Sequence, residues 1–197
     1  MLSRKNAKAA DDPPDRDPIS AFPLMQILSA RKYATPRNGP LTLEQFETRR
    51  LAYAIKTIAS PTADFDTAAR EMAGLICGPC WLVPIPDSVG NTDANTKLAS
   101  HIARYVPGAQ VVKAICRTRP IQSQCTRHKL ALGPILPEQH HMARTGKLLT
   151  LRQTYFIDNV TTSGNTLEAA RAALGFGAGL VFADAATRRT QIQATLL

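Results

Sequence analysis

The chain has 197 residues, 44% of them hydrophobic, which is enough for one well-buried domain but not for two independent cores. Lys and Arg outnumber Asp and Glu by 24 to 15, and the resulting net charge of +9 favours anionic partners such as phosphorylated metabolites, nucleic acid or a membrane surface. The basic amino-terminal residues lack the apolar core of a secretory signal and no apolar run is long enough to span a membrane, so we expect a cytoplasmic protein with reduced cysteines and no membrane partner.

Residues 1–40 contain many of the prolines and charges of both signs, with a single short apolar patch, AFPLMQIL. A segment of this composition buries too little apolar surface to fold alone. We therefore predict a flexible, partly disordered arm that docks on the rest of the protein through the apolar patch.

Residues 41–80 have the pattern of a helical element. Thr42 and Gln45 are spaced as in a capping box, and the apolar residues that follow recur on one helical face as far as Pro61. A second helix is predicted from residue 63 to residue 76, where the turn CGPC ends it.

The cysteines suggest two sites that we do not expect. CGPC is the sequence of thioredoxin-type redox sites, but such a site follows a strand and begins a helix, whereas here a helix precedes it and a strand follows. A zinc site would need ligands at regular paired spacing. That spacing is missing among the candidates Cys77, Cys80, Cys116, Cys125 and His128.

Residues 81–197 alternate between short apolar runs and amphipathic helical patterns. The predicted strands are WLVPIP, AQVVKAI, QTYFIDNV and AGLVFADAAT, and the predicted helices are NTDANTKLASHIARYV and NTLEAARAALGF. Strands that alternate with helices indicate an α/β domain with a parallel sheet and right-handed crossovers, as in Rossmann-like folds. The interval 116–153 has weak periodicity, and a loop of that length inside a compact domain is usually functional or disordered.

The segment FIDNVTTSGNT, residues 156–166, has the composition of a phosphate-binding loop. We expect Asp158 to end a strand of the parallel sheet, where ligands bind, and a helix to begin near Leu167. Gly164 permits a tight turn, and the free amides at the helix start favour an anion. The predicted phosphate cradle consists of Thr161, Thr162, Ser163, Gly164, Asn165 and Thr166.

This loop differs from the common nucleotide-binding loops. A Walker loop requires Gly-Lys-Ser/Thr after four spacer residues, and a dinucleotide loop requires three glycines. The carboxylate of Asp158 shortly before the cradle suits a sugar phosphate, because it can bind ribose hydroxyls while the loop holds the 5′-phosphate. An ordinary strand, turn and capped helix remains the alternative interpretation.

The stretch YFIDNVTTSGNTLEAARAAL resembles the phosphoribosyl pyrophosphate (PRPP) motif of the type I phosphoribosyltransferases, in which an apolar strand leads to two acidic residues and a Thr/Ser-Gly-x-Thr loop. The resemblance extends to the ComF-like competence proteins and covers about residues 80–187. The amino-terminal zinc ribbon common in ComF-like proteins is absent. The further matches are the strand end Val83 to Pro86 and the loop residues Arg117, Arg119, Gln124 and Arg127.

The resemblance implies a role for each matching position. Asp158 and Asn159 would occupy the catalytic, ribose-binding positions, with Asp158 indirectly at a Mg²⁺ ion, and the cradle would hold the 5′-phosphate. Pro86, Asp87 and Ser88 would approach the pyrophosphate. A flexible basic lid would contain Arg117, Arg119, Arg127 and Lys129.

The charge distribution agrees with a lid. Residues 113–152 contain eight Lys and Arg and the single acid Glu138, so seven of the net positive charges fall in this interval. A tetra-anionic ligand with Mg²⁺ requires such a clamp. The same interval also fits a solvated or nucleic-acid-binding surface.

Asn159 departs from the acidic pair, since an amide can bond a ribose hydroxyl but carries no charge. Two functions therefore stay open. One is a glycosyltransferase of nucleotide metabolism that moves a phosphoribosyl group from PRPP to an unidentified nitrogen acceptor. The other is a non-catalytic ComF-like protein that binds single-stranded DNA or a DNA-processing partner during DNA uptake. The sequence also leaves a homodimer open.

Overall fold

The computed structural model describes residues 25–34, 39–123, 126–127, 130–146 and 152–185. Most of the predicted flexible arm, up to residue 24, lies outside the described residues. The same is true of Lys129, Cys125 and His128. None of the described helices is both long and apolar enough to cross a membrane.

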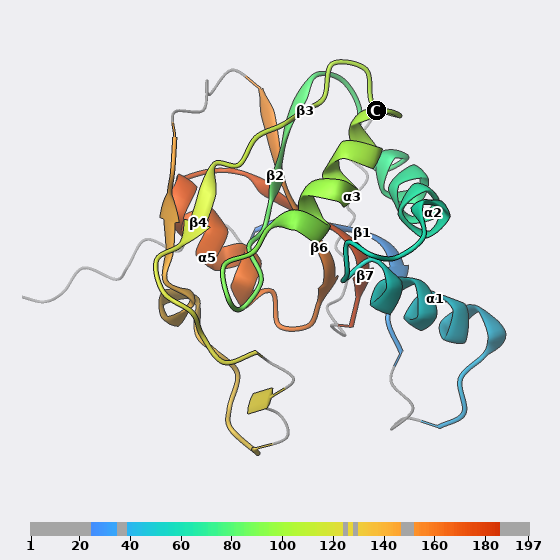
Figure 1. Ribbon diagram of the computed structural model, residues 1–197, viewed down its shortest axis with the longest axis horizontal. Coiled ribbons are helices and arrows are strands. Elements are labelled where there is room, and N and C mark those ends of the chain that lie inside the picture. Colours follow the sequence, from blue (N-terminus) through green and yellow to red (C-terminus); the bar gives the residue numbers. More distant parts are fainter. Residues whose placement is uncertain (1–24, 35–38, 124–125, 128–129, 147–151, 186–197) are drawn as a thin grey trace, which may run out of the picture.

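The protein has an α/β fold built on a five-stranded sheet in which all neighbouring strands are parallel (Figure 1). The order across the sheet is β1, β7, β6, β2, β3. This arrangement, with helices on both faces, is compatible with the Rossmann-like fold that the alternating pattern predicts. The strands are β1 (Ile27–Lys32), β2 (Cys80–Pro84), β3 (Gln110–Val111), β6 (Gln153–Thr161) and β7 (Ala178–Asp184).

Three helices cover one face of the sheet: α1 (Leu43–Ala54), α2 (Thr62–Ala73) and α3 (Asp93–Ala103) (Figure 1). The capping box predicted at Thr42 and Gln45 is confirmed, because each side chain accepts a hydrogen bond from the other residue's backbone N–H. Buried side chains such as Phe65 of α2 and Ile102 of α3 pack there against Leu82 and Ile157 of the central strands. This larger part of the core fixes the helices to the sheet.

The opposite face carries α5 (Asn165–Leu174) and a two-stranded antiparallel ribbon (Figure 1). The ribbon pairs β4 (Ile115–Arg117) with β5 (Met142–Arg144), and the short 3₁₀ helix η2 (Pro137–His140) leads into β5. Val83, Phe156 and Val181 point to this face and pack against Leu167 and other residues of α5. Successive residues of the central strands thus serve opposite faces, as expected for a doubly covered parallel sheet.

Within the segment predicted to be a partly disordered arm, residues 27–32 form the strand β1. Strand β1 pairs in parallel with β7 at the sheet edge, so the last two residues of the apolar patch, Ile27 and Leu28, belong to a strand of the sheet. Arg31 makes a two-pronged ion pair with Glu71 of α2, with Nε at 2.7 Å from Oε2. The pattern ILSARK has no clear alternation, and only partners distant in sequence make it a strand.

Two other boundaries differ from the prediction. The segment AQVVKAI divides into β3 and β4, which belong to different sheets, because the chain leaves the main sheet after Val111. Strand β6 continues three residues past Asp158, since Asn159, Val160 and Thr161 still lie along β7. Asp158 therefore lies within the paired part of β6, three residues before the strand ends.

The docking of β1 is tested by Arg31→Ala. We expect this change to lower the free energy of unfolding by about 1 to 2 kcal/mol, because it removes a partly buried, bidentate ion pair and leaves Glu71 unpaired. Chemical denaturation measures the change. Lys32→Ala, at the exposed neighbouring position, is the control and should stay within about 0.5 kcal/mol of wild type. Equal effects of the two changes would contradict a docked β1.

Candidate functional site

The candidate site lies at the carboxyl ends of β2 and β6, the two central strands. From β2 the chain passes through α3 on one face to β3, and from β6 it passes through α5 on the other face to β7. The direction of winding therefore reverses between β2 and β6. In open α/β sheets, ligands bind in the crevice at this reversal.

A pocket of about 450 Å³ opens at this position. Its walls come from three parts of the chain: the connection between α1 and α2, the loop from β2 into α3, and the end of β6 with the start of α5. The lining residues are Lys56, Thr57, Ile58, Pro86, Asp87, Asn91, Asp93, Ala94, Asn95, Asp158, Asn159 and Thr166.

The loop between β6 and α5 presents unused backbone donors. Gly164 has φ of +82°, the left-handed conformation that glycine adopts without strain, and α5 begins directly after it. Within the described chain, the backbone N–H groups of Thr162, Ser163 and Gly164 donate to no protein acceptor. Free N–H groups at the amino end of a ten-residue helix favour an anion.

The predicted cradle residues have different surroundings. Thr166 lines the pocket, and Thr162, four residues earlier, is exposed. Thr161 is buried at the end of β6, where its carbonyl accepts the N–H of Ala185. Ser163 Oγ accepts the N–H of Asn165 at 3.3 Å. The cradle is therefore a backbone feature with Thr166 as its pocket-facing hydroxyl residue.

Asn165 has a role that the sequence did not indicate. Its side-chain amide donates to the carbonyl of Ile135 at 2.8 Å. Ile135 is buried and belongs to the long interval predicted to form a lid. The start of α5 is thus tied to that interval.

Asp158 is a partly buried carboxylate on the pocket wall. Its Oδ1 accepts the backbone N–H of Asn159 at 2.8 Å and the side-chain amide of Asn95 at 3.4 Å. Burial raises the pKa of Asp158 to about 6, even though both hydrogen bonds favour the charged form. Ionised Asp158 is therefore held at a free-energy cost, as is common for groups that act on a ligand.

Asn159 has a structural role that accounts for the missing second acid. Its side-chain amide donates to the carbonyl of Ala52 at 3.1 Å, and the hydrogen bond is buried. Ala52 lies in the last turn of α1, where carbonyls lack helical partners. A carboxylate at position 159 would place two acceptors face to face, so the amide is required by the docking of α1.

The predicted pyrophosphate loop is a tight turn closed by its own carboxylate. Asp87 Oδ1 accepts the N–H groups of Val89 and Asn91, both at 2.9 Å. Pro86 and Asp87 line the pocket, whereas the carbonyl of Ser88 accepts the N–H of Ile121. The turn is therefore rigid before any ligand binds.

Arg117 stabilises that turn rather than reaching into the pocket. Its guanidinium donates to the carbonyls of Asp87, at 2.8 Å, of Pro86, at 3.3 Å, and of His140. Burial lowers the pKa of Arg117, although Asp87 and Asp158 oppose the shift. Because these donors are committed to carbonyls, Arg117 is a positioning residue for the turn.

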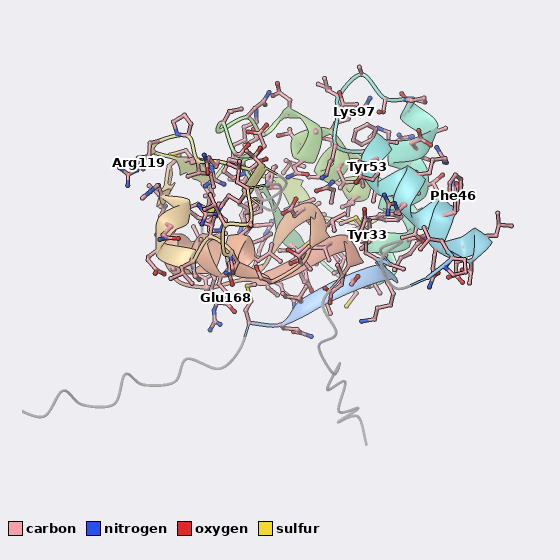
Figure 2. All side chains as sticks on the ribbon, turned by 90° about the horizontal axis from the view of Figure 1, so that it is seen from below. Tyr33, Phe46, Tyr53, Lys97, Arg119 and Glu168 are labelled. Carbon is pink, nitrogen blue, oxygen red and sulfur yellow. The ribbon has the colours of Figure 1, made fainter. Side chains whose placement is uncertain are left out.

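Arg119 and Arg127, also assigned to the lid, lie outside the pocket lining. Arg127 donates to the carbonyl of Gly133 within its own loop, at 2.9 Å. Arg119 is exposed and lies on the opposite side of the molecule from Phe46 and Tyr53 of α1 (Figure 2). Lys129 lies outside the described residues.

Three contributions to the site were missed from the sequence. Asn95 joins the two central strands, since its amide donates to the carbonyl of Ile85 as well as to Asp158. Lys97 donates to the carbonyls of Ile58, at 2.9 Å, and Ser60, at 3.1 Å. The α1–α2 connection forms a pocket wall. The sequence signal for Asn95 and Lys97 is weak: they are polar residues near the start of a helix that follows a buried strand.

The described residues contain no group of three or more His, Cys, Asp or Glu side chains placed to hold a metal ion. Of the cysteines, Cys77 is exposed, and Cys80 is buried, which raises the pKa of its thiol. Both lie at the amino end of β2, at the edge of the sheet opposite to the pocket.

No family model matches the chain, and no curated protein sequence is significantly similar to it.

The role of Asn159 is tested by comparing two substitutions. We expect Asn159→Ala to lower the free energy of unfolding by about 1 to 3 kcal/mol, because the carbonyl of Ala52 loses its buried partner. Asn159→Asp should cost more, because it adds a buried charge facing that carbonyl. Denaturant titration at pH 7 measures both. An Asp variant as stable as wild type would contradict the proposed docking role.

Asp158→Asn should stabilise the protein at neutral pH. The carboxyl binds its proton more tightly in the folded protein, with a pKa of about 6, than in the unfolded chain, so wild-type stability is lost as the pH rises through about 4 to 6. The amide has no such loss, and we expect it to gain about 1 to 3 kcal/mol at pH 7 and almost nothing at pH 4. Thermal unfolding at both pH values tests this, and a gain independent of pH would contradict it.

Proposed function

We propose that the chain binds PRPP, or another ribose 5-phosphate ligand with Mg²⁺, in the strand-end pocket and transfers the phosphoribosyl group to a nitrogen acceptor. The observation that carries the proposal is the free backbone donors of residues 162–164, which follow the strand that carries the partly buried carboxylate of Asp158. The loop supplies donors for a terminal phosphate, and the carboxylate supplies an acceptor for ribose hydroxyls. The resemblance of this stretch to the PRPP motif supports the same assignment.

The reaction is a substitution at the anomeric carbon. The acceptor nitrogen forms a bond to that carbon, the bond to the pyrophosphate oxygen breaks, and pyrophosphate leaves with the electron pair. The acceptor releases its N–H proton to a base, and Asp158, with a pKa of about 6, is largely ionised at pH 7 and suited to receive it. The rigid Asp87 turn and the loop before α5 hold the reacting ends in line.

The pocket fits a metal ion that arrives with the ligand. Mg²⁺ commonly keeps several waters and is bound by one or two carboxylates together with substrate phosphates. Asp158 would act on the ion indirectly, by accepting hydrogen bonds from its water ligands, and Mg²⁺ would neutralise charge on the leaving pyrophosphate. Asn95 orients Asp158 by donating to Oδ1, which leaves Oδ2 for the ligand.

A second function is favoured by the position of the free basic residues. Arg119 is exposed, makes no ion pair or hydrogen bond in the described part of the chain, and lies outside the pocket. In this alternative the protein binds single-stranded DNA non-catalytically through the 113–152 interval. Titration with an oligonucleotide tests it: affinity should fall steeply with salt and weaken in Arg119→Ala. Binding that ignores salt and Arg119 would exclude it.

PRPP with Mg²⁺ should raise the melting temperature of the wild-type protein. Thr166→Val should bind about tenfold or more weakly, because a hydroxyl that contacts a charged phosphate is lost while the shape is kept. Asp158→Asn should lose the shift despite its higher stability. Thr67→Val is the matched control, since Thr67 is an exposed residue of α2 outside the pocket.

Differential scanning fluorimetry with millimolar PRPP measures these shifts. No shift in the wild-type protein, or equal shifts in Thr166→Val and Thr67→Val, would contradict the proposal.

A further inference from the structure

The wall of the pocket opposite α5 is the connection between α1 and α2, within the part of the chain that has no resemblance to the PRPP motif. Two contacts hold this wall in place. Lys97 donates to two of its carbonyls while its ammonium lies 4.3 Å from the centroid of the Phe65 ring, and Figure 2 shows Lys97 on the side of the connection. Asn159 binds the last turn of α1. The wall is therefore preorganised.

Lys56 gives this wall a positive charge, which favours the ionised form of Asp158 in the same pocket. Its ammonium lies 5.4 Å from the ring centroid of Tyr53 and makes no hydrogen bond or ion pair with any described residue. The ammonium of Lys97, by contrast, donates to the carbonyls of Ile58 and Ser60. Lys56 is thus free to bind an anionic group that enters the pocket.

Asp93 gives the facing loop an uncommitted negative charge. Its carboxylate accepts no hydrogen bond and forms no ion pair among the described residues, whereas that of Asp87 in the same loop is satisfied by two backbone N–H groups. Asp93 is in the first turn of α3, where its negative charge interacts favourably with the helix dipole. Its side chain is nevertheless exposed and can contact a ligand.

We infer that this side of the pocket is the acceptor subsite, and that the acceptor is a small molecule carrying both an acidic group, bound by Lys56, and a nitrogen with N–H donors, directed at Asp93. The inference rests on the proposed function, because the phosphoribosyl ligand would occupy the half of the pocket near Asp158 and Thr166.

The pairing of opposite charges restricts the ligand class. A purely anionic acceptor would be repelled by Asp93 and Asp87, and a purely cationic one by Lys56. The exposed side chain of Ile58, two residues after Lys56 on the same pocket wall, offers an apolar contact for a flat ring. An aromatic ring that carries both a carboxylate and an amino group satisfies all three requirements: the acid, the N–H donor and the flat apolar surface.

The test measures binding of three probes to the full chain by calorimetry, with and without PRPP and Mg²⁺. The probes are 2-aminobenzoate, which carries both groups, benzoate, which carries the acid alone, and aniline, which carries the nitrogen alone. Each is compared on wild type, Lys56→Gln and Asp93→Asn. Lys32→Gln is the control, because Lys32 is an exposed lysine outside the pocket.

We expect 2-aminobenzoate to bind most tightly. Lys56→Gln should weaken 2-aminobenzoate and benzoate about fivefold or more and leave aniline unchanged, Asp93→Asn should weaken 2-aminobenzoate and aniline, and Lys32→Gln should change nothing. Equal binding of 2-aminobenzoate to wild type and both pocket variants, or no binding, would overturn the inference. If PRPP produces no shift while the Lys56 and Asp93 dependence is present, the proposed transfer fails and the subsite stands.

Discussion

The buried hydrogen bond from the Asn159 side chain to the carbonyl of Ala52 determines how the site is built. It joins the end of the central strand β6 to the last turn of α1, more than one hundred residues earlier in the chain. Because of this bond, the α1–α2 connection lies over the strand end and closes one side of the pocket. The residue that departs from an acidic pair is thus the residue that attaches the amino-terminal helices.

This attachment leaves Asp158 as the carboxylate that the end of β6 contributes to the pocket. With α1, the β2 loop and Asn95 packed around it, Asp158 is desolvated, and its pKa rises to about 6. A site with one such carboxylate is consistent with a ligand that brings its own Mg²⁺, and with a base that accepts a proton near neutral pH. In the proposed function, the backbone donors before α5 would bind the phosphate, a role that basic side chains could otherwise fill.

Much of the fold could be predicted from the sequence, because strands and helices with strong periodicity carry local information. The parallel α/β class, the capping box at Thr42 and the helix that starts after Gly164 all depend on neighbouring residues. Strand β1 could not be predicted, because ILSARK becomes a strand only through pairing with β7 and the contact between Arg31 and Glu71. The same limit applies to the division of AQVVKAI between two sheets.

The site divides in the same way. Asp158 and the loop that follows it stand out as a motif, and of this stretch the structure brings Asp158, Asn159 and Thr166 into one pocket with Asp87. The roles of Arg117, Asn159 and Lys97 are set by backbone carbonyls far away in the sequence, and carbonyls leave no trace in a pattern of side chains. For this reason Arg117 was predicted as a mobile lid residue, whereas it holds the Asp87 turn.

The most direct test of this account is a crystal structure of the protein with ribose 5-phosphate and Mg²⁺. The account predicts the phosphate at the backbone N–H groups of residues 162–164 and the ribose hydroxyls at Asp158. A phosphate bound instead among the exposed arginines of the 113–152 interval, with the pocket free of ligand, would contradict it.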